Sequence, residues 1–176
     1  MGGCTNDNRG RQIKLWWLRR RLRLAGYILV VVSNQPIVAR GLSSPAEVEL
    51  VHARIQELLA QEGGAEIDRF YFCPHHPNAT VAEYRQDCQC RKPRIGMLVQ
   101  AARELRLDLA GSVMVGDRPS DIASGRRAGC RTVQIESGRH LEAPIESPDD
   151  YAAEVTPDHR SVDLAAAADW ILGEFA

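Results

Sequence analysis

Long apolar runs are missing from this sequence. The longest uninterrupted run, residues 27–32, is far shorter than the ~20 apolar residues that a membrane-spanning helix needs. A secretory signal is not visible either, because residues 1–8 are polar and arginines interrupt the stretch after them, where a signal peptide would have a continuous apolar core. These absences exclude an integral membrane protein, and we expect a cytosolic protein with no membrane partner.

Lysine is almost absent, since only Lys14 and Lys92 accompany twenty arginines. The net charge of -1 hides an uneven distribution, because residues 1–46 sum to +7 and residues 47–176 to -8. A basic segment can bind an anionic partner, but the arginines near residues 19–23 are equally typical of the solvated side of a helix. The charges of residues 74–94 nearly balance without an aromatic platform, so we expect no nucleic-acid partner.

Internal repeats and low-complexity tracts are also missing, and the length and the 44% hydrophobic content fit one domain over residues 1–176. The apolar spacing and the glycine and proline signals predict helices at 13–25, 43–61, 96–107, 121–128 and 162–175, and strands at 28–32, 67–73, 112–115 and 131–135. Residues 74–94 form a predicted loop, and the prolines of residues 137–161 predict an irregular surface excursion. Alternating strands and helices predict an α/β fold with a mainly parallel sheet covered on both sides.

Four potential metal ligands lie close together in the predicted loop of residues 73–92. Cys73, His75, Cys88 and Cys90 have the spacing C-x-H, twelve residues, C-x-C, and thiolate and imidazole are the ligands that tetrahedral zinc prefers. Four ligands leave no open position, so a zinc ion here would be structural. His76 is an adjacent alternative to His75. The competing interpretation, ordinary buried thiols and a surface histidine, does not explain why they cluster in a loop without an apolar period.

Polar side chains follow the predicted strands at the edge where parallel α/β sheets bind ligands. Candidate phosphate-binding residues are Ser33, Asn34 and Gln35 after one strand, the cations Arg91 and Lys92 after the metal loop, and Arg118 after another strand. Asp117 is a candidate Mg²⁺ ligand, whereas Asp121 fits a helix cap better. Each feature also has an ordinary structural explanation, as a polar strand end or a solvated basic pair.

These features, in this order, resemble the haloacid-dehalogenase-like (HAD) phosphatases. The resemblance covers about residues 15–136 and is most specific for the zinc-loop branch, which contains D-glycero-D-manno-heptose 1,7-bisphosphate phosphatase and histidinol-phosphate phosphatase. Residues 30–35 resemble the family's second motif, Lys92 its third and Gly116 with Asp117 its fourth, and the comparison favours His75 over His76. Residues 37–41 are more similar to the heptose branch, although Ile37 stands where glycine is expected.

The resemblance implies a HAD-like Rossmannoid three-layer sandwich that hydrolyses a sugar phosphate through an aspartyl-phosphate, with the 7-phosphate of heptose 1,7-bisphosphate as the expected target. It implies that Lys92 and Ser33 stabilise the phosphoryl group and that Asp117 holds Mg²⁺. Substrate contacts are expected from Ser33, Asn34, Gln35, Arg91, Lys92 and Arg118.

One part of the family pattern is missing from the sequence. The family's first motif is an apolar strand followed by D-x-D, whereas Asp7 here is followed by asparagine, arginine and glycine. The nucleophile and the general acid are thus absent, and residues 1–14 are an atypical N-terminus that a truncated or misassigned start would explain. In this fold the nucleophile strand lies between the strands that end at Ser33 and Asp117. We therefore expect a gap of roughly 9–10 Å between these two strands and no phosphatase turnover. The resemblance implies a monomer, but the incomplete sheet is expected to cause poor folding or dimerisation.

Two other functions remain open from the sequence. The chain could be a catalytically inactive, zinc-stabilised relative that binds a sugar phosphate or a partner protein, and binding of a phosphate analogue without turnover would identify it. It could also act like a histidinol-phosphate phosphatase, because the metal ligands are shared by both branches of the resemblance.

Overall fold

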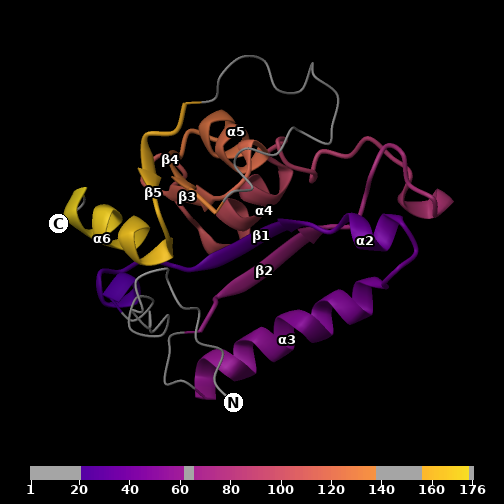
Figure 1. Ribbon diagram of the computed structural model, residues 1–176, viewed down its shortest axis with the longest axis horizontal. Helices are drawn as coiled ribbons and strands as arrows, with labels where there is room; N and C mark the ends of the chain where they lie inside the picture. Colours follow the sequence, from indigo (N-terminus) through magenta and orange to yellow (C-terminus); the bar gives the residue numbers. More distant parts are fainter. Residues whose placement is uncertain (1–20, 62–65, 138–155, 175–176) are drawn as a thin grey trace.

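The computed structural model describes residues 21–61, 66–137 and 156–174 (Figure 1). Residues 21–24 are helical and lead into the first strand. The elements that follow are, in chain order, β1 (Val30–Asn34), α2 (Pro36–Ala39), α3 (Pro45–Gln61), β2 (Arg69–Cys73), the 3₁₀ turn η1 (Ala82–Tyr84), α4 (Gly96–Leu105), β3 (Val113–Gly116), α5 (Pro119–Arg127), β4 (Arg131–Ile135), β5 (His159–Ser161) and α6 (Leu164–Glu174).

Most predicted elements are present, although several bounds differ by one or two residues and the short helix α2 and the turn η1 were not predicted. The first strand ends at Asn34 rather than Val32, so Ser33 and Asn34 lie inside β1. Helix α5 begins at Pro119 instead of Asp121, because proline fits the first helical turn. Residues 159–161, expected in the irregular excursion, form β5 beside β4. The predictions for residues 1–14, for the first part of the helix at 13–25 and for most of the excursion fall outside the described residues.

The parallel pairing that the sequence predicts is confirmed, but the described strands form two sheets. β1 pairs with β2, and β3 pairs with β4, which pairs with β5; all three pairings are parallel. Within the described residues neither β1 nor β3 has a second strand partner. The carboxyl ends of both sheets carry the residues that the sequence singled out, after Asn34 and after Gly116.

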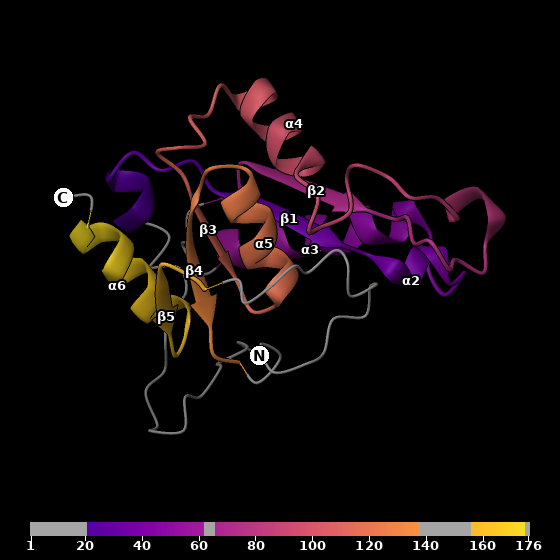
Figure 2. The same ribbon diagram turned by 90° about the horizontal axis from the view of Figure 1, so that it is seen from above.

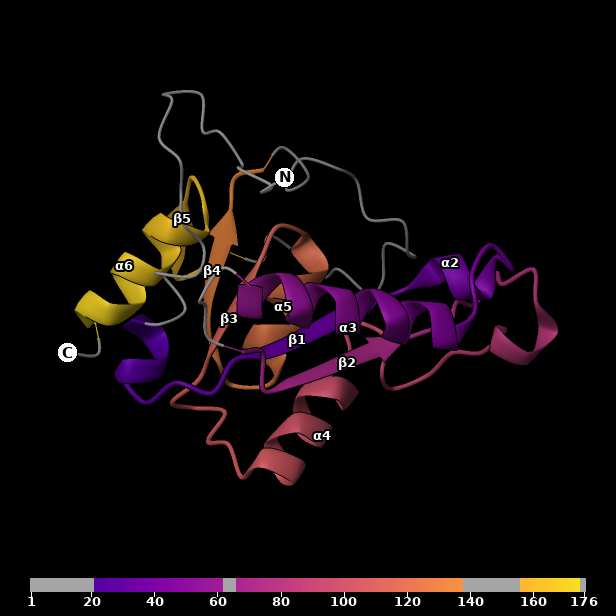
Figure 3. The same cartoon turned by 90° about the horizontal axis from the view of Figure 1, so that it is seen from below.

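Helices cover both faces of the first sheet, as Figures 2 and 3 show. Side chains alternate along β2. Phe70 stacks on His52 of α3, with ring centroids 4.6 Å apart. Tyr71 and Cys73 point to the other face, where they form a buried cluster with Met97 and Ala101 of α4. The two faces of β2 therefore place α3 and α4 on opposite sides of the sheet.

The second sheet packs closely against α5. A Cβ atom built on Gly125 of this helix would lie 2.6 Å from Met114 Cβ and 2.8 Å from Thr132 Cγ2, so only glycine permits this approach of helix and sheet. α6 packs beside β4 and β5, and its stacked pair Trp170 and His159 has ring centroids 4.7 Å apart. These contacts hold β3 and its following loop in place.

No helix in residues 21–61, 66–137 and 156–174 combines the length and apolar character needed to cross a bilayer. Helix α3, the longest described one, begins with a reciprocal pair of hydrogen bonds between Ser44 and Glu47. Glu47 N–H donates to Ser44 Oγ at 3.2 Å, and Ser44 N–H donates to Glu47 Oε2 at 2.7 Å. The hydrogen bond from the Ser44 backbone N–H to the Glu47 carboxylate lowers the pKa of Glu47.

Candidate functional site

Four side chains converge at the end of β2 in the arrangement that the sequence predicts. Cys73, the last residue of β2, lies with His75, Cys88 and Cys90 so that all four donor atoms are within 4.8 Å of one another. The three sulfur atoms are 3.0–3.3 Å apart, and His75 Nδ1 is 3.3 Å from Cys90 Sγ. These four residues are called the Cys/His cluster below.

The Cys/His cluster fits a tetrahedral metal ion. A zinc ion with Zn–S bonds of ~2.3 Å holds its sulfur ligands roughly 3.8 Å apart, so small side-chain movements would admit the ion. Burial raises the pKa of the Cys73 thiol. Burial also acts to raise the pKa of Cys88, but hydrogen bonds from Cys90 and Cys73 lower it overall. When bound, such an ion would supply cross-linking of the loop rather than chemistry, since all four positions are filled by protein.

The structure distinguishes between the two candidate histidines. His75 Nδ1 points into the cluster, whereas His76 Nδ1 accepts a hydrogen bond from the Asn78 backbone at 3.0 Å. The turn at residues 76–79 thus uses His76 for its own structure. His75 is the histidine of the candidate metal centre, in agreement with the choice that the resemblance favours.

The Cys/His cluster is tied directly to the basic pair that follows it. Arg91 is only 9% exposed, and its Nη1 donates to the carbonyl of His75 at 3.1 Å. Arg94 Nη1 donates to the carbonyl of Cys88 at 2.8 Å. Gly96 at the start of α4 lies against the same loop, because a Cβ there would be 3.0 Å from Cys90 N. These contacts therefore hold residues 91–96 against the metal loop.

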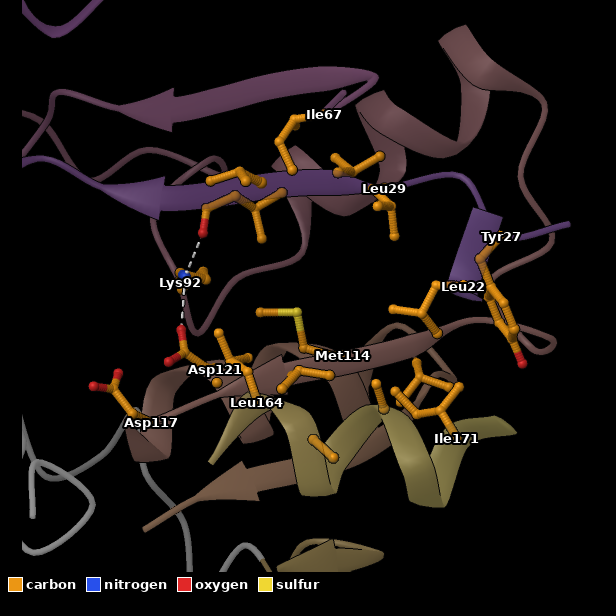
Figure 4. A pocket seen from close by; sticks show the side chains of 18 residues that line it. Leu22, Tyr27, Leu29, Ile67, Lys92, Met114, Asp117, Asp121, Leu164 and Ile171 are labelled. Atoms are coloured by element: carbon orange, nitrogen blue, oxygen red, sulfur yellow. Dashed lines mark hydrogen bonds and ion pairs between the residues drawn. The ribbon is translucent and has the colours of Figure 1, made fainter. Parts of the chain in front are cut away.

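Lys92 connects the two sheets at their carboxyl ends. Its side chain is buried, at 7% exposure for the residue, and Nζ donates to the carbonyl of Val32 in β1 at 2.7 Å. The same ammonium pairs with Asp121 Oδ1 of α5 at 2.6 Å (Figure 4). A buried charge needs a partner of opposite charge, and here the pair spans from β1 to the helix after β3.

Asn34 holds the backbone of Lys92 through two hydrogen bonds. Its Nδ2 donates to the Lys92 carbonyl, and Lys92 N–H donates to Asn34 Oδ1, both at 3.0 Å. Arg127 of α5 adds a third contact to this turn by donating from Nη1 to the Pro93 carbonyl at 3.2 Å. The sequence grouped Asn34 with substrate contacts, whereas its amide is engaged in positioning Lys92. The contact of Arg127 with this turn could not be predicted from the sequence, because arginine is common at the end of a helix.

Ser33 and Gln35 interact with each other at the end of β1. Gln35 Nε2 donates to Ser33 Oγ at 2.8 Å, and Gln35 N–H donates to the carbonyl of Cys73. The amide therefore orients the hydroxyl and leaves the hydroxyl proton to donate elsewhere. The two residues lie beside Asn34 at the edge where Lys92 also ends.

The loop after β3 places two carboxylates at the same edge. Asp117 is half-buried, and its Oδ2 accepts a hydrogen bond from Ser137 Oγ at 3.1 Å. Asp121 accepts from the backbone N–H of Arg118 at 3.0 Å, so it caps α5 from inside the first turn, as well as pairing with Lys92. A Cβ on Gly116 would lie 2.5 Å from Asp121 Cγ, so Asp121 needs glycine at this position. Arg118 is the residue before α5.

A cavity of about 460 Å³ lies between the two sheets and ends at these polar groups. Its walls are mostly apolar and come from β1, β3 and α6, with Lys92, Asp117 and Asp121 at one end (Figure 4). Of the residues that the sequence singled out, Lys92, Asp117 and Asp121 line this cavity, whereas Ser33 is the residue after Val32, whose carbonyl accepts from Lys92. The Cys/His cluster precedes Lys92 in the sequence, and none of its four residues lines the cavity.

The parallel α/β fold, with a buried lysine and two carboxylates at its carboxyl edge, is the arrangement that the resemblance to the HAD-like hydrolases implies. Residues 89–167 match the family model described as HAD-hydrolase-like. The chain is 41% identical, over 89% of its length and 80% of the relative's, to the D-glycero-D-manno-heptose-1,7-bisphosphate 7-phosphatase of Thermosynechococcus vestitus. It is 37% identical to the enzyme with the corresponding name from Yersinia pestis, over 89% of this chain and 73% of that one.

Solved structures give the same result. The D,D-heptose 1,7-bisphosphate phosphatase of B. bronchiseptica, crystallised with magnesium and phosphate, superposes with a TM-score of 0.72 at 32% identity, over 90% of this chain and 82% of that one. A HAD-like phosphatase from Mesorhizobium loti superposes with a TM-score of 0.71 at 28% identity, over 92% and 72%. This chain belongs to the heptose-bisphosphate phosphatase family of the HAD-like hydrolases.

Proposed function

We propose that this chain carries the phosphate-binding part of a heptose 1,7-bisphosphate 7-phosphatase site and binds the sugar phosphate without hydrolysing it. The observation that carries the proposal is the buried Lys92 ammonium, held between Val32 and Asp121 at the carboxyl edge of both sheets. A lysine ammonium is a compact point charge that suits a phosphoryl oxygen. The family relatives, which are named for this activity, support the choice of substrate.

The other polar groups of the site suit recognition of the same anion. The Ser33 hydroxyl, oriented by Gln35, can donate to a phosphoryl oxygen. Arg118 lies at the start of α5, where guanidinium and helix N-terminus both favour negative charge. We assign Arg91 an indirect part, because its Nη1 is hydrogen-bonded to His75 and it ties the phosphate site to the metal loop.

The donor set of the site also fits Mg²⁺. Phosphate sites hold this ion through one or two carboxylates together with phosphate oxygens and water, and Asp117 offers such a carboxylate. Bound there, Mg²⁺ would neutralise phosphate charge. We propose zinc for the Cys/His cluster, because three thiolates and one imidazole are the ligands of structural zinc.

We expect no turnover because neither described carboxylate at the site is available as a nucleophile. The sequence contains no Asp-x-Asp. Of the two described carboxylates at the site, Asp121 is engaged by Lys92 and by the Arg118 backbone, and Asp117 takes the metal position. A covalent route needs a nucleophile aimed at phosphorus, and neither group is available for that task.

A paired binding and release assay tests this function. The 176-residue chain is purified with zinc, and heptose 1,7-bisphosphate is titrated calorimetrically in the presence of Mg²⁺, while released phosphate is measured in the same samples. We expect binding without release, and weaker binding of histidinol phosphate. Release of phosphate by the purified chain, lost in Lys92→Ala, would contradict the proposal; so would absence of any binding.

A further inference from the structure

The two arms of the Cys/His cluster are supported in different ways. Cys73 is the last residue of β2, so the sheet holds it, and its carbonyl accepts a hydrogen bond from Gln35 N–H at 2.8 Å. Cys88 and Cys90 belong to a segment that is neither helix nor strand. The arm that carries these two cysteines therefore depends on the residues packed against it.

The turn that leads into α4 gives the second arm two hydrogen bonds. Gly96 N–H donates to the carbonyl of Gln89, the residue between the two cysteines, at 2.9 Å. A Cβ on Gly96 would lie 2.4 Å from that carbonyl oxygen, so only glycine permits this approach. Arg94 Nη1 donates to the carbonyl of Cys88 at 2.8 Å. One backbone bond and one side-chain bond thus hold the C-x-C segment against the start of α4.

The Arg94 guanidinium spans two acceptors on this arm. While Nη1 reaches the Cys88 carbonyl, Nη2 donates to Asp87 Oδ2 at 2.6 Å, and the two charged groups form an ion pair. The backbone N–H of Arg94 donates to the Arg91 carbonyl at 2.9 Å, which fixes the base of the side chain. Because a guanidinium presents its donors in a rigid planar fork, these bonds hold the backbone at Asp87 and Cys88 relative to the turn.

The charge of a metal-loaded cluster favours a cation at this position. Three thiolates and a neutral imidazole around Zn²⁺ leave one net negative charge, and a partly buried charge needs a partner of opposite sign. Arg91 supports the first arm through the His75 carbonyl at 3.1 Å, and Arg94 supports the second arm through the Cys88 carbonyl. Each arm of the cluster therefore has one arginine on the carbonyl of a ligand residue.

We propose that Arg94 is a positioning residue of the metal centre, which holds Cys88 in the place where the Cys/His cluster binds zinc. Arg94 has this role only if the cluster binds the zinc ion proposed above, on which the inference rests. The fork acts on Cys88 through its carbonyl and through the neighbouring Asp87. Groups that orient metal ligands in this way commonly change metal affinity by about 10- to 100-fold.

The test follows zinc release from the full, zinc-loaded chain into a chromophoric chelator. Arg94→Gln removes the fork and the charge, and we expect release to become roughly tenfold faster or more. Arg94→Lys keeps the charge on a single ammonium group, and we expect it to recover only part of this loss. The matched control is Arg85→Gln, because Arg85 donates to the carbonyls of Ala79 and Thr80 in the same loop, and neither residue is a ligand.

A change at the other end of the fork tests the same inference at an exposed position. The Asp87 side chain is 71% exposed, so Asp87→Asn removes the ion pair with Arg94 at little risk to folding. We expect this variant to release zinc faster than the unmodified chain, by a smaller factor than Arg94→Gln. Unchanged release from Asp87→Asn and from a folded Arg94→Gln chain would overturn the inference.

Cobalt gives a second measurement, which reports the ligands directly. Co²⁺ loaded in place of zinc shows tetrahedral thiolate ligation by its visible absorption, and we expect Arg94→Gln to alter these bands while Arg85→Gln leaves them unchanged. Equal effects of the two variants on zinc release and on cobalt absorption would overturn the inference, as would full recovery in Arg94→Lys. A folded, unmodified chain that binds no zinc would instead overturn the zinc proposal and this inference together.

Discussion

The side-chain amide of Asn34 and the backbone of Lys92 are joined by a reciprocal pair of hydrogen bonds, each 3.0 Å long. The pair connects the end of β1 with the turn that follows the Cys/His cluster, 58 residues further along the chain. Lys92, for which we propose phosphate binding, is therefore positioned from both directions, by the sheet through Asn34 and by the metal loop through Arg91. A metal ion bound by the Cys/His cluster would therefore help to hold Lys92 in place.

Replacing Asn34 should weaken phosphate binding more than it weakens the fold. Asn34→Ala removes both hydrogen bonds to Lys92, and we expect affinity for heptose 1,7-bisphosphate to fall about tenfold, measured by calorimetry. Gln56→Ala is the matched control, because Gln56 makes the same two bonds to the backbone of Ile67, at 2.9 and 3.0 Å, away from the phosphate site. Equal loss of affinity in both variants would show that Asn34 acts only on stability.

Gly116→Ala should displace Asp121. The added methyl group would overlap the Asp121 side chain, whose Cγ lies 2.5 Å from the Cβ position. We expect a loss of stability of ~1–3 kcal/mol and weaker phosphate binding, measured by denaturant unfolding and calorimetry. Gly173→Ala provides the control, since a Cβ at that position of α6 meets nothing within 4 Å. A stable Gly116→Ala variant with unchanged affinity would be incompatible with the described packing.

Cys90→Ser should reduce the bound metal. We expect about one zinc per chain in the unmodified protein by atomic spectroscopy and clearly less in the variant, with a lower melting temperature, because metal binding contributes folding free energy. Cys130→Ser is the control, since Cys130 is buried but lies outside the Cys/His cluster. Equal zinc content in both variants would rule out Cys90 as a ligand.

The ionised Asp158 carboxylate should stabilise the folded chain at neutral pH and lose this effect in acid. Burial acts to raise its pKa, but hydrogen bonds from the Thr132 backbone and hydroxyl, at 2.7 and 2.8 Å, lower the pKa overall. A lowered pKa in the folded state means stabilisation that is complete above the unfolded value of about 3.9 and is lost as pH falls through the folded value. Asp158→Asn should therefore cost about 1 kcal/mol at neutral pH, after allowance for its partial exposure.

The pH profile of unfolding separates this effect from a general loss of charge. The difference between Asp158→Asn and the unmodified chain should shrink below about pH 4 and vanish in stronger acid. Glu57→Gln removes an equal charge from an exposed pair with Arg54 on α3 and should show little difference at any pH. A constant difference across the range would contradict the role of the Asp158 carboxylate.

The sequence predicted the parts of this molecule whose signals are local. β-branched runs and the positions of proline and glycine identified strands and helices, and the spacing of Cys73 and its partners identified the candidate metal site. Long-range relations had no such signal. The hydrogen bonds between Asn34 and Lys92 and between Arg127 and Pro93 depend on how β1, the metal loop and α5 pack together. Strand β5 was missed because three residues carry too little pattern.

The most direct test of the account titrates heptose 1,7-bisphosphate into two proteins, the unmodified chain and the double variant Lys92→Met/Asp121→Asn. The double change removes both members of the buried pair, so neither charge is left without a partner. We predict binding by the unmodified chain, affinity lower by roughly tenfold or more in the variant, and no phosphate release from either. Equal affinity of the two folded proteins, or release of phosphate by the unmodified chain, would contradict the account.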